Sequence, residues 1–322
     1  MKKINATIIT GFLGAGKTTL LNEILAQAAG ERIVVIVNEF GEVGIDGQLV
    51  VETAEAIVEL NNGCICCTVR GDLVVAISDL IRSDRPIDRL IIETSGLADP
   101  APVIQSFILD DLMSAHVQLD AIVTVVDVRH IARQLQHDEA REQIAFADIL
   151  LLNKIDLEDE AASEAAECAA RRLNPLARFL RTRECAVEAR QVLDLGAFDL
   201  KNLLALDPDL LADHAHEHSS EIGCVALTIE EGLDPDAFNR WLNRLLQDRG
   251  ADILRMKGVL NFSGDKRRYV FHGVHMTLDG RPGRPWLNEE RRVSQIVFIG
   301  RQLDREALLQ GLEACRAIAT AA

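Results

Sequence analysis

Near its start the chain reads Gly11-Phe12-Leu13-Gly14-Ala15-Gly16-Lys17-Thr18. This octapeptide fits the pattern G-x-x-x-x-G-K-[ST] of a phosphate-binding loop. A β-branched apolar run at residues 5–10 precedes it, and an amphipathic stretch at residues 17–28 follows it. The glycines let backbone N–H groups wrap a chain of phosphates, and the N-terminus of the following helix adds positive potential. The sequence therefore predicts a strand, a nucleotide phosphate loop and a helix, in this order.

Two side chains of this loop have expected chemical roles. Lys17 is expected to reach the β- and γ-phosphates, and the Thr18 hydroxyl is expected to bind Mg²⁺. Both are therefore candidate catalytic residues as well as ligands. The alternative is a glycine-rich turn that holds an incidental lysine. The nucleotide-binding residues predicted in this segment are Gly11, Phe12, Leu13, Gly14, Ala15, Gly16, Lys17, Thr18 and Thr19.

Short apolar runs alternate with amphipathic stretches as far as about residue 206. The expected strands are residues 5–10, 33–37, 57–60, 89–93, 121–126 and 149–152, and the expected helices are residues 17–28, 71–82, 101–109, 129–137 and 161–173. Apolar strands separated by helices are typical of a mostly parallel sheet that is covered on both faces. Such sheets bind ligands at the carboxyl ends of their strands. We therefore predict an α/β domain at residues 1–206.

A smaller second domain is expected at residues 221–322. Residues 207–220 are polar and predict a linker. Strands are expected at residues 222–229, 253–262, 268–276 and 292–299, and helices at residues 235–246 and 305–315. This order predicts an α+β domain with an antiparallel sheet. His214, His216 and His218 either bind a metal or are solvated in the linker. His272 and His275 are expected to be structural and to face opposite sides of one strand.

Composition excludes several classes of partner. The 322 residues include 34 Lys and Arg against 50 Asp and Glu, which gives a formal charge of −16. Because so acidic a chain repels polyanions, we expect neither nucleic acid nor an anionic membrane as a partner. No apolar run approaches the ~20 residues of a membrane-spanning helix, and the first residues lack the cleavage site of a signal peptide. We therefore expect a cytoplasmic protein.

A second motif, Asn153-Lys154-Ile155-Asp156, directly follows the apolar run at residues 149–152. The carboxylate of Asp156 can accept hydrogen bonds from the ring N–H and the exocyclic amine of guanine, which adenine does not present in that arrangement. Asn153 can bond the purine edge or brace the loop, and the stem of Lys154 can cover the ring. The alternative is an ordinary helix N-cap at Asp156. The tetrad favours GTP and GDP over adenine nucleotides.

A third motif, Glu93-Thr94-Ser95-Gly96, ends the strand expected at residues 89–93. An acidic side chain at a strand end beside a phosphate loop commonly binds Mg²⁺, and Gly96 can offer its N–H to a γ-phosphate. The alternative for Glu93 is a surface glutamate on a turn. The glycine-containing residues 38–46 predict a switch that γ-phosphate and Mg²⁺ order. We find no glutamine placed to orient the attacking water, so we expect slow intrinsic hydrolysis, roughly 5 × 10⁻⁴ s⁻¹ or a little faster.

Three of the seven cysteines fall within four residues, at Cys64, Cys66 and Cys67. Thiolates this close can bind one soft or borderline cation such as zinc, Cu(I) or cobalt. The incomplete ligand set leaves a position for water, for a ligand from a client protein, or for a switch carboxylate such as Glu39 or Glu42. Buried cysteines without a metal and a redox pair of Cys64 with Cys67 are the alternatives. The cysteines expected to be incidental are Cys168, Cys185, Cys224 and Cys315.

Taken in order, these motifs resemble those of the CobW-type metallochaperone GTPases. The resemblance rests on G-F-L-G-A-G-K-T-T-L-L, N-E-F-G-E-V-G-I-D, G-C-I-C-C-T-V-R, E-T-S-G-L-A-D-P and N-K-I-D, and it continues through R-M-K-G-V-L-N-F, F-H-G-V-H and I-V-F-I-G-R-Q-L-D. It implies a P-loop GTPase domain that delivers zinc, or in some members cobalt, under the control of GTP. It also implies a metal site at Cys64, Cys66 and Cys67, and a nucleotide close to Cys67, Thr68, Val69, Arg70 and Gly71.

From this resemblance we expect a GTPase that converts GTP and water to GDP and phosphate and passes Zn²⁺ to a client metalloprotein. One alternative is a cobalt-handling GTPase of cobalamin biosynthesis. Another is a small-molecule kinase that uses the same phosphate loop, although the N-K-I-D loop and the cysteine cluster speak against it. A passive zinc buffer is a third. The sequence leaves open which client is served and whether the protein forms a homo-oligomer.

Overall fold

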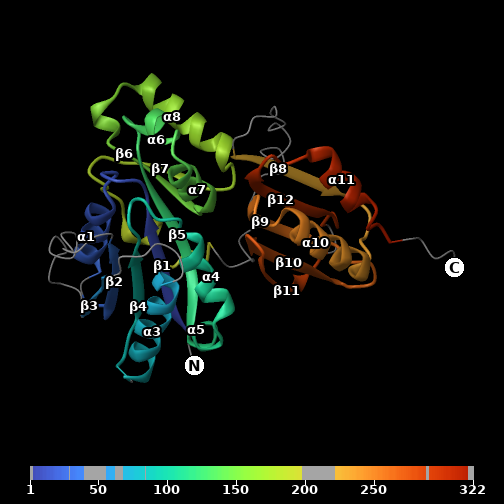
Figure 1. The fold of residues 1–322 in the computed structure, drawn as a ribbon, viewed down its shortest axis with the longest axis horizontal. Helices are drawn as coiled ribbons and strands as arrows, with labels where there is room; N and C mark the ends of the chain where they lie inside the picture. Colours follow the sequence, from blue (N-terminus) through green and yellow to red (C-terminus); the bar gives the residue numbers. More distant parts are fainter. Residues whose placement is uncertain are drawn as a thin grey trace. The chain divides into compact units, whose positions relative to one another are not determined.

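The computed structural model describes residues 3–28, 30–39, 56–61, 68–83, 85–197, 222–287 and 290–317, and at 38–39, 56–61 and 68–70 it describes the backbone. The chain divides into two compact units, which we call the first and the second domain. The first contains a seven-stranded sheet and the second a five-stranded sheet (Figure 1). The linker predicted at residues 207–220, with His214, His216 and His218, lies outside the described residues, so the predicted boundaries stay predictions.

The sheet of the first domain is parallel throughout its described pairings. Its strands lie in the order β3-β2-β4-β1-β5-β6-β7. Because parallel strands end on the same edge, the loops that follow β1, β4, β5 and β6 come together there. The strands are β1 (Ile4–Thr10), β2 (Ile33–Glu39), β3 (Ala56–Asn61), β4 (Arg89–Glu93), β5 (Val117–Asp127), β6 (Ile149–Asn153) and β7 (Arg178–Arg181).

Helices cover this sheet and explain why its strands are apolar along their whole length. Every residue of β4 and of β6 is buried. Leu20, Leu21 and Ile24 of α1 are fully buried in one cluster with apolar side chains of β1, β2, β4, β5 and β6, and each such side chain contributes about 1.5–3 kcal/mol. The strand ends are therefore held rigidly. The helices are α1 (Lys17–Gln27), α3 (Thr68–Arg82), α4 (Ala101–Leu109), α5 (Asp111–His116), α6 (Ile131–Gln134), α7 (Asp138–Phe146) and α8 (Glu160–Leu173).

The second domain is an antiparallel sheet with two helices packed on one face. Its strands are β8 (Ile222–Ile229), β9 (Ile253–Leu260), β10 (Arg267–Val274), β11 (Thr277–Pro285) and β12 (Ser294–Arg301), in the order β11-β10-β9-β12-β8. Phe238 of α10 (Pro235–Arg249) and Leu312 of α11 (Arg305–Glu313) share a buried cluster with Met256 and Phe298 of the sheet. Asp234 and Asp304 cap the two helices through hydrogen bonds to backbone N–H groups. The predicted α+β domain with an antiparallel sheet is confirmed.

Some details of the predicted elements are wrong. The helix predicted at residues 129–137 covers only residues 131–134 in the structure, as α6. The helices α5 and α7 were not predicted. Two peripheral strands, β7 and β11, were also missed. β11 is an exposed edge strand with prolines, which an edge tolerates because one side of it needs no hydrogen bonds.

His275 does not lie on the strand with buried His272; it follows β10 in a turn with a left-handed φ of 50°. None of the helices described is long and apolar enough to span a membrane.

Candidate nucleotide site

The phosphate loop joins β1 to α1 through backbone conformations that favour glycine. Gly11 has a φ of 140° and Gly16 a φ of 115°. A Cβ atom at Gly11 would lie 2.3 Å from the carbonyl oxygen of Val125, and one at Gly16 would lie 2.7 Å from the side-chain nitrogen of Asn153. These glycines therefore provide both the turn and the close contact with β5 and β6. Since α1 begins at Lys17, the positive end of its dipole lies at this loop.

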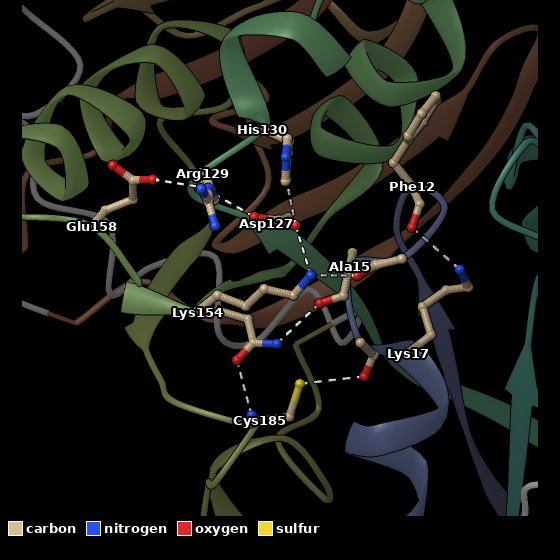
Figure 2. Close-up of polar contacts among 12 residues, drawn as sticks. Phe12, Ala15, Lys17, Asp127, Arg129, His130, Lys154, Glu158 and Cys185 are labelled. Atoms are coloured by element: carbon tan, nitrogen blue, oxygen red, sulfur yellow. Dashed lines mark hydrogen bonds and ion pairs between the residues drawn. The ribbon is translucent and has the colours of Figure 1, made fainter. Parts of the chain in front are cut away.

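The predicted catalytic residues meet where β1 and β4 end. In the parallel register Ile9 pairs with Glu93, so the last residue of β4 lies beside the start of the phosphate loop. The Thr18 Oγ1 donates a hydrogen bond of 2.9 Å to Oε1 of Glu93, which is only 2% exposed. The buried Lys17 Nζ donates to the backbone oxygen of Phe12 at 3.4 Å, within the loop itself (Figure 2). A hydroxyl and a carboxylate in contact are the hard oxygen ligands that Mg²⁺ prefers, so this pair fits the ion.

The N-K-I-D loop is attached directly to the phosphate loop. Asn153 donates from Nδ2 to the backbone oxygen of Ala15 at 3.0 Å, and the Nζ of Lys154 donates to the backbone oxygen of Gly14 at 2.7 Å (Figure 2). Lys154 has a left-handed φ of 65°, which directs the chain into a short 3₁₀ turn, Ile155–Leu157. Asp156 in that turn is exposed and available to a ligand. Asn153 thus braces the loop, one of its two expected roles.

Asp127, which the sequence analysis missed, holds Lys154 in this position. Its Oδ2 accepts from Lys154 Nζ at 2.7 Å and contacts Nδ1 of His130 at 3.0 Å, and its Oδ1 accepts from the N–H of Arg129 at 3.0 Å. Burial raises the pKa of the Asp127 carboxyl, but the hydrogen bonds and charges of Lys154 and His130 outweigh burial and leave this pKa below its ordinary value of 3.8. The ionised carboxylate therefore stabilises the fold at neutral pH, and this contribution is lost only as the pH falls through the lowered pKa.

Cys185, expected to be incidental to the metal site, lies in contact with the phosphate loop and the N-K-I-D loop, a contact that the sequence did not predict. Its thiol donates to the backbone oxygen of Gly16 at 3.3 Å, and its N–H donates to Oδ1 of Asn153 at 2.9 Å (Figure 2). Burial raises the pKa of the Cys185 thiol to about 12. It is therefore a neutral hydrogen-bond donor at physiological pH. The loop after β7 thus packs on the phosphate loop and the N-K-I-D loop together.

The remaining predicted residues are placed less completely. Thr19 lies in the first turn of α1 and is exposed, and the exposed Gly71 lies in α3 with Thr68, Val69 and Arg70 before it. Glu39 ends β2 and pairs with Asn61 at the end of β3. Cys64, Cys66, Cys67 and Glu42 lie outside the described residues. Within the described ranges there is no group of three or more His, Cys, Asp or Glu side chains that could hold a metal.

Comparison with known families gives two matches along the chain. Residues 5–181 match the CobW/HypB/UreG nucleotide-binding domain, and residues 222–316 match the C-terminal domain of the cobalamin synthesis protein CobW. The chain belongs to the CobW family. The first match runs from β1 to β7 and the second from β8 past α11, so the two family domains coincide with the two sheets.

Individual CobW-family relatives are similar over nearly the whole chain. The zinc chaperone YjiA of Escherichia coli is 35% identical over 316 residues, which cover 96% of this chain and 97% of that protein. The zinc-regulated GTPase metalloprotein activator 1 of Schizosaccharomyces pombe is 32% identical, with 94% and 83% covered. The crystal structure of the Zn(II)-bound YjiA GTPase of E. coli superposes with a TM-score of 0.78 at 28% identity and covers 98% of this chain and 100% of that chain. The fold of the CobW family therefore extends through both domains.

Asp127→Asn is expected to weaken guanine-nucleotide binding by this CobW-family chain about tenfold, because a neutral amide loses the ion pair that holds Lys154 over the phosphate loop. The amide oxygen can still accept from the N–H of Arg129, so the fold is retained. Titration with a fluorescent GDP analogue measures the effect. Asp138→Asn, which removes the ion pair of an exposed carboxylate with Arg141, serves as the control and is expected to bind normally. Equal affinities for both variants would show that Asp127 does not act on the nucleotide site.

Proposed function

We propose that the protein hydrolyses GTP to GDP and phosphate and, under the control of this nucleotide, passes Zn²⁺ to a client metalloprotein. One observation carries the nucleotide part of the proposal: Lys154 and Asn153 bond the N-K-I-D loop to the backbone oxygens of Gly14 and Ala15. A loop suited to read guanine is thereby held at a fixed distance from a loop suited to hold phosphates. Relatives named zinc chaperones support the zinc part and favour zinc over the cobalt-handling alternative.

Within the proposed GTPase, the residues at the phosphate end of the site have different roles. Lys17 would neutralise the β- and γ-phosphates. Thr18 and Glu93 would hold Mg²⁺, which when bound neutralises the charge that develops on the phosphate oxygens. The N–H groups of residues 11–18 and the N-terminus of α1 would orient the phosphate chain. Intrinsic hydrolysis stays predicted to be slow, and the residue that positions the attacking water is not assigned.

The proposed zinc ligands are the thiolates of Cys64, Cys66 and Cys67, with Glu39 or Glu42 as candidate carboxylate ligands. The proposal is supported by the topology, since the cysteines fall between the end of β3 at Asn61 and the start of α3. β3 ends on the same edge of the parallel sheet as the phosphate loop, so a nucleotide there can couple to the metal. We also propose that Cys67, Thr68, Val69, Arg70 and Gly71 lie near the nucleotide, that the client docks at the second domain, and that the protein is cytoplasmic.

Zinc titration tests the coupling between the two ligands. We expect the protein to bind Zn²⁺ about tenfold more tightly with a non-hydrolysable GTP analogue than with GDP, and by thermodynamic reciprocity Zn²⁺ should raise the affinity for the GTP analogue by the same factor. A double Cys66→Ser, Cys67→Ser variant is expected to lose this zinc binding. Cys168→Ser, at an exposed cysteine of α8, is the matched control. Equal zinc affinities with the two nucleotides, or full binding by the double variant, would refute the proposed mechanism.

A further inference from the structure

The segment that follows β4, residues 94–100, is held between two partners. On one side Gly96 packs against the phosphate loop so closely that a Cβ atom there would lie 2.8 Å from both the N and the Cδ2 of Leu13. On the other side the side-chain Nε2 of Gln143 donates to the backbone oxygens of Gly96 and of Ala98, each at 3.1 Å. The two hydrogens of one amide group thus fix two carbonyls of this segment. Since the segment begins directly after Glu93, it belongs to the phosphate end of the site.

Gln143 is itself fixed to the sheet. It lies on α7 and is only 1% exposed. Its backbone oxygen accepts a 2.7 Å hydrogen bond from Oγ1 of Thr124, a buried residue of β5. Thr124 in turn pairs with Thr10, the last residue before the phosphate loop. The amide that holds Gly96 and Ala98 is therefore anchored to the same strand end from which the phosphate loop departs.

The helices around Gln143 also contact the phosphate loop directly. The ring of Phe12 lies 5.2 Å from the ring of His137, which directly precedes α7. A small cavity of about 10 Å³ is lined by Phe12, Val125, Ile131 and Gln143, among others. The α6–α7 region therefore touches both segments that would meet a γ-phosphate, the phosphate loop and residues 94–100.

We propose that Gln143 is a positioning residue for the γ-phosphate end of the nucleotide site. By holding the Gly96 and Ala98 carbonyls it keeps the Gly96 backbone against the phosphate loop, so that a third phosphate meets a peptide group already in place. If residues 94–100 had to become ordered when GTP binds, the free-energy cost of ordering them would weaken the binding of GTP. The binding of GDP, which has no γ-phosphate, would not carry this cost. This inference rests on the proposed function, namely that GTP binds at residues 11–18.

Two substitutions of Gln143 test the role with different side effects. Gln143→Glu keeps the shape but, when ionised, offers no donor to the two carbonyls, and Gln143→Met keeps the volume without introducing a buried charge. Gln136→Glu and Gln136→Met make the same changes at an exposed position in the turn before α7. For each variant the affinities for GDP and for a non-hydrolysable GTP analogue, the single-turnover rate of GTP hydrolysis and the melting temperature with saturating GDP are measured.

We expect both Gln143 variants to bind the GTP analogue about tenfold more weakly and to hydrolyse GTP about tenfold more slowly. Their affinity for GDP should change less than about twofold, and the Gln136 variants should match the unmodified protein. Equal losses for GDP and the GTP analogue would overturn the inference, because they would show a structural role alone, and so would unchanged values for both nucleotides. Failure of the unmodified protein to bind GTP would instead refute the proposed function.

Discussion

Gly11→Ala is expected to abolish the binding of both GDP and GTP and to lower the free energy of unfolding by about 3 kcal/mol. The new methyl group would lie 2.3 Å from the backbone oxygen of Val125. Val125 lies within β5, whose backbone is paired with β1 and β6 and cannot withdraw without breaking those pairings. The φ of 140° at Gly11 is also disfavoured for alanine. The phosphate loop would have to leave the sheet, and Lys17 would move with it.

Nucleotide titration and urea denaturation measure the two effects separately. Gly30→Ala is a matched control, because Gly30 has a φ of 99° but has no atom within 4 Å of the position of a Cβ. Its cost should be confined to the left-handed backbone, about 1 kcal/mol, and it should bind GDP normally. If Gly11→Ala binds GDP as tightly as the unmodified protein, residues 11–18 do not hold the phosphates.

Much of the fold was predictable because it is encoded locally. β4 and α4 have the predicted bounds, residues 89–93 and 101–109, since a strand buried on both faces is apolar throughout and its helix shows a matching apolar stripe. Elements at the periphery are different. β7 is only four residues long and partly exposed, and β11 is polar and contains prolines. Nothing in such short or polar stretches distinguishes a strand from a loop until the neighbouring strand is known.

The candidate site divides in the same way. Lys17, Thr18 and Glu93 come from short motifs, and the parallel register of β1 and β4 places these motifs side by side. Asp127 could have been found, because it ends an apolar strand just as Glu93 does.

Two further residues of the site had no local signal. Gln143 acts on Gly96, 47 residues away, and Cys185 acts on Gly16, 169 residues away. Both side chains lie in sequences that otherwise suggest an ordinary helix or loop. Their roles follow from tertiary contacts, which cannot be identified from the residue pattern of a single sequence.

Asp156→Asn is expected to weaken GTP binding about 100-fold and to create affinity for xanthosine triphosphate. In the structure Asp156 is exposed in a turn that Asn153 and Lys154 fasten to the phosphate loop. A carboxylate there can accept both from the ring N–H and from the 2-amino group of guanine. The amide oxygen of asparagine can accept one of these hydrogen bonds, but the amide NH₂ group then faces the second N–H donor of guanine and cannot pair with it. Xanthine has an oxygen in place of the amino group and restores the match.

Competition of GTP, ATP and xanthosine triphosphate against a fluorescent GDP analogue measures this exchange. Asp159→Asn is the matched control, because Asp159 is equally exposed nearby and accepts the N–H of Ala162, a capping role that asparagine fills as well as aspartate. Asp159→Asn should therefore keep both stability and preference for GTP. A loss of GTP binding without a gain for xanthosine triphosphate would mean that Asp156 does not read the base edge. Equal binding of ATP and GTP by the unmodified protein would refute guanine recognition altogether.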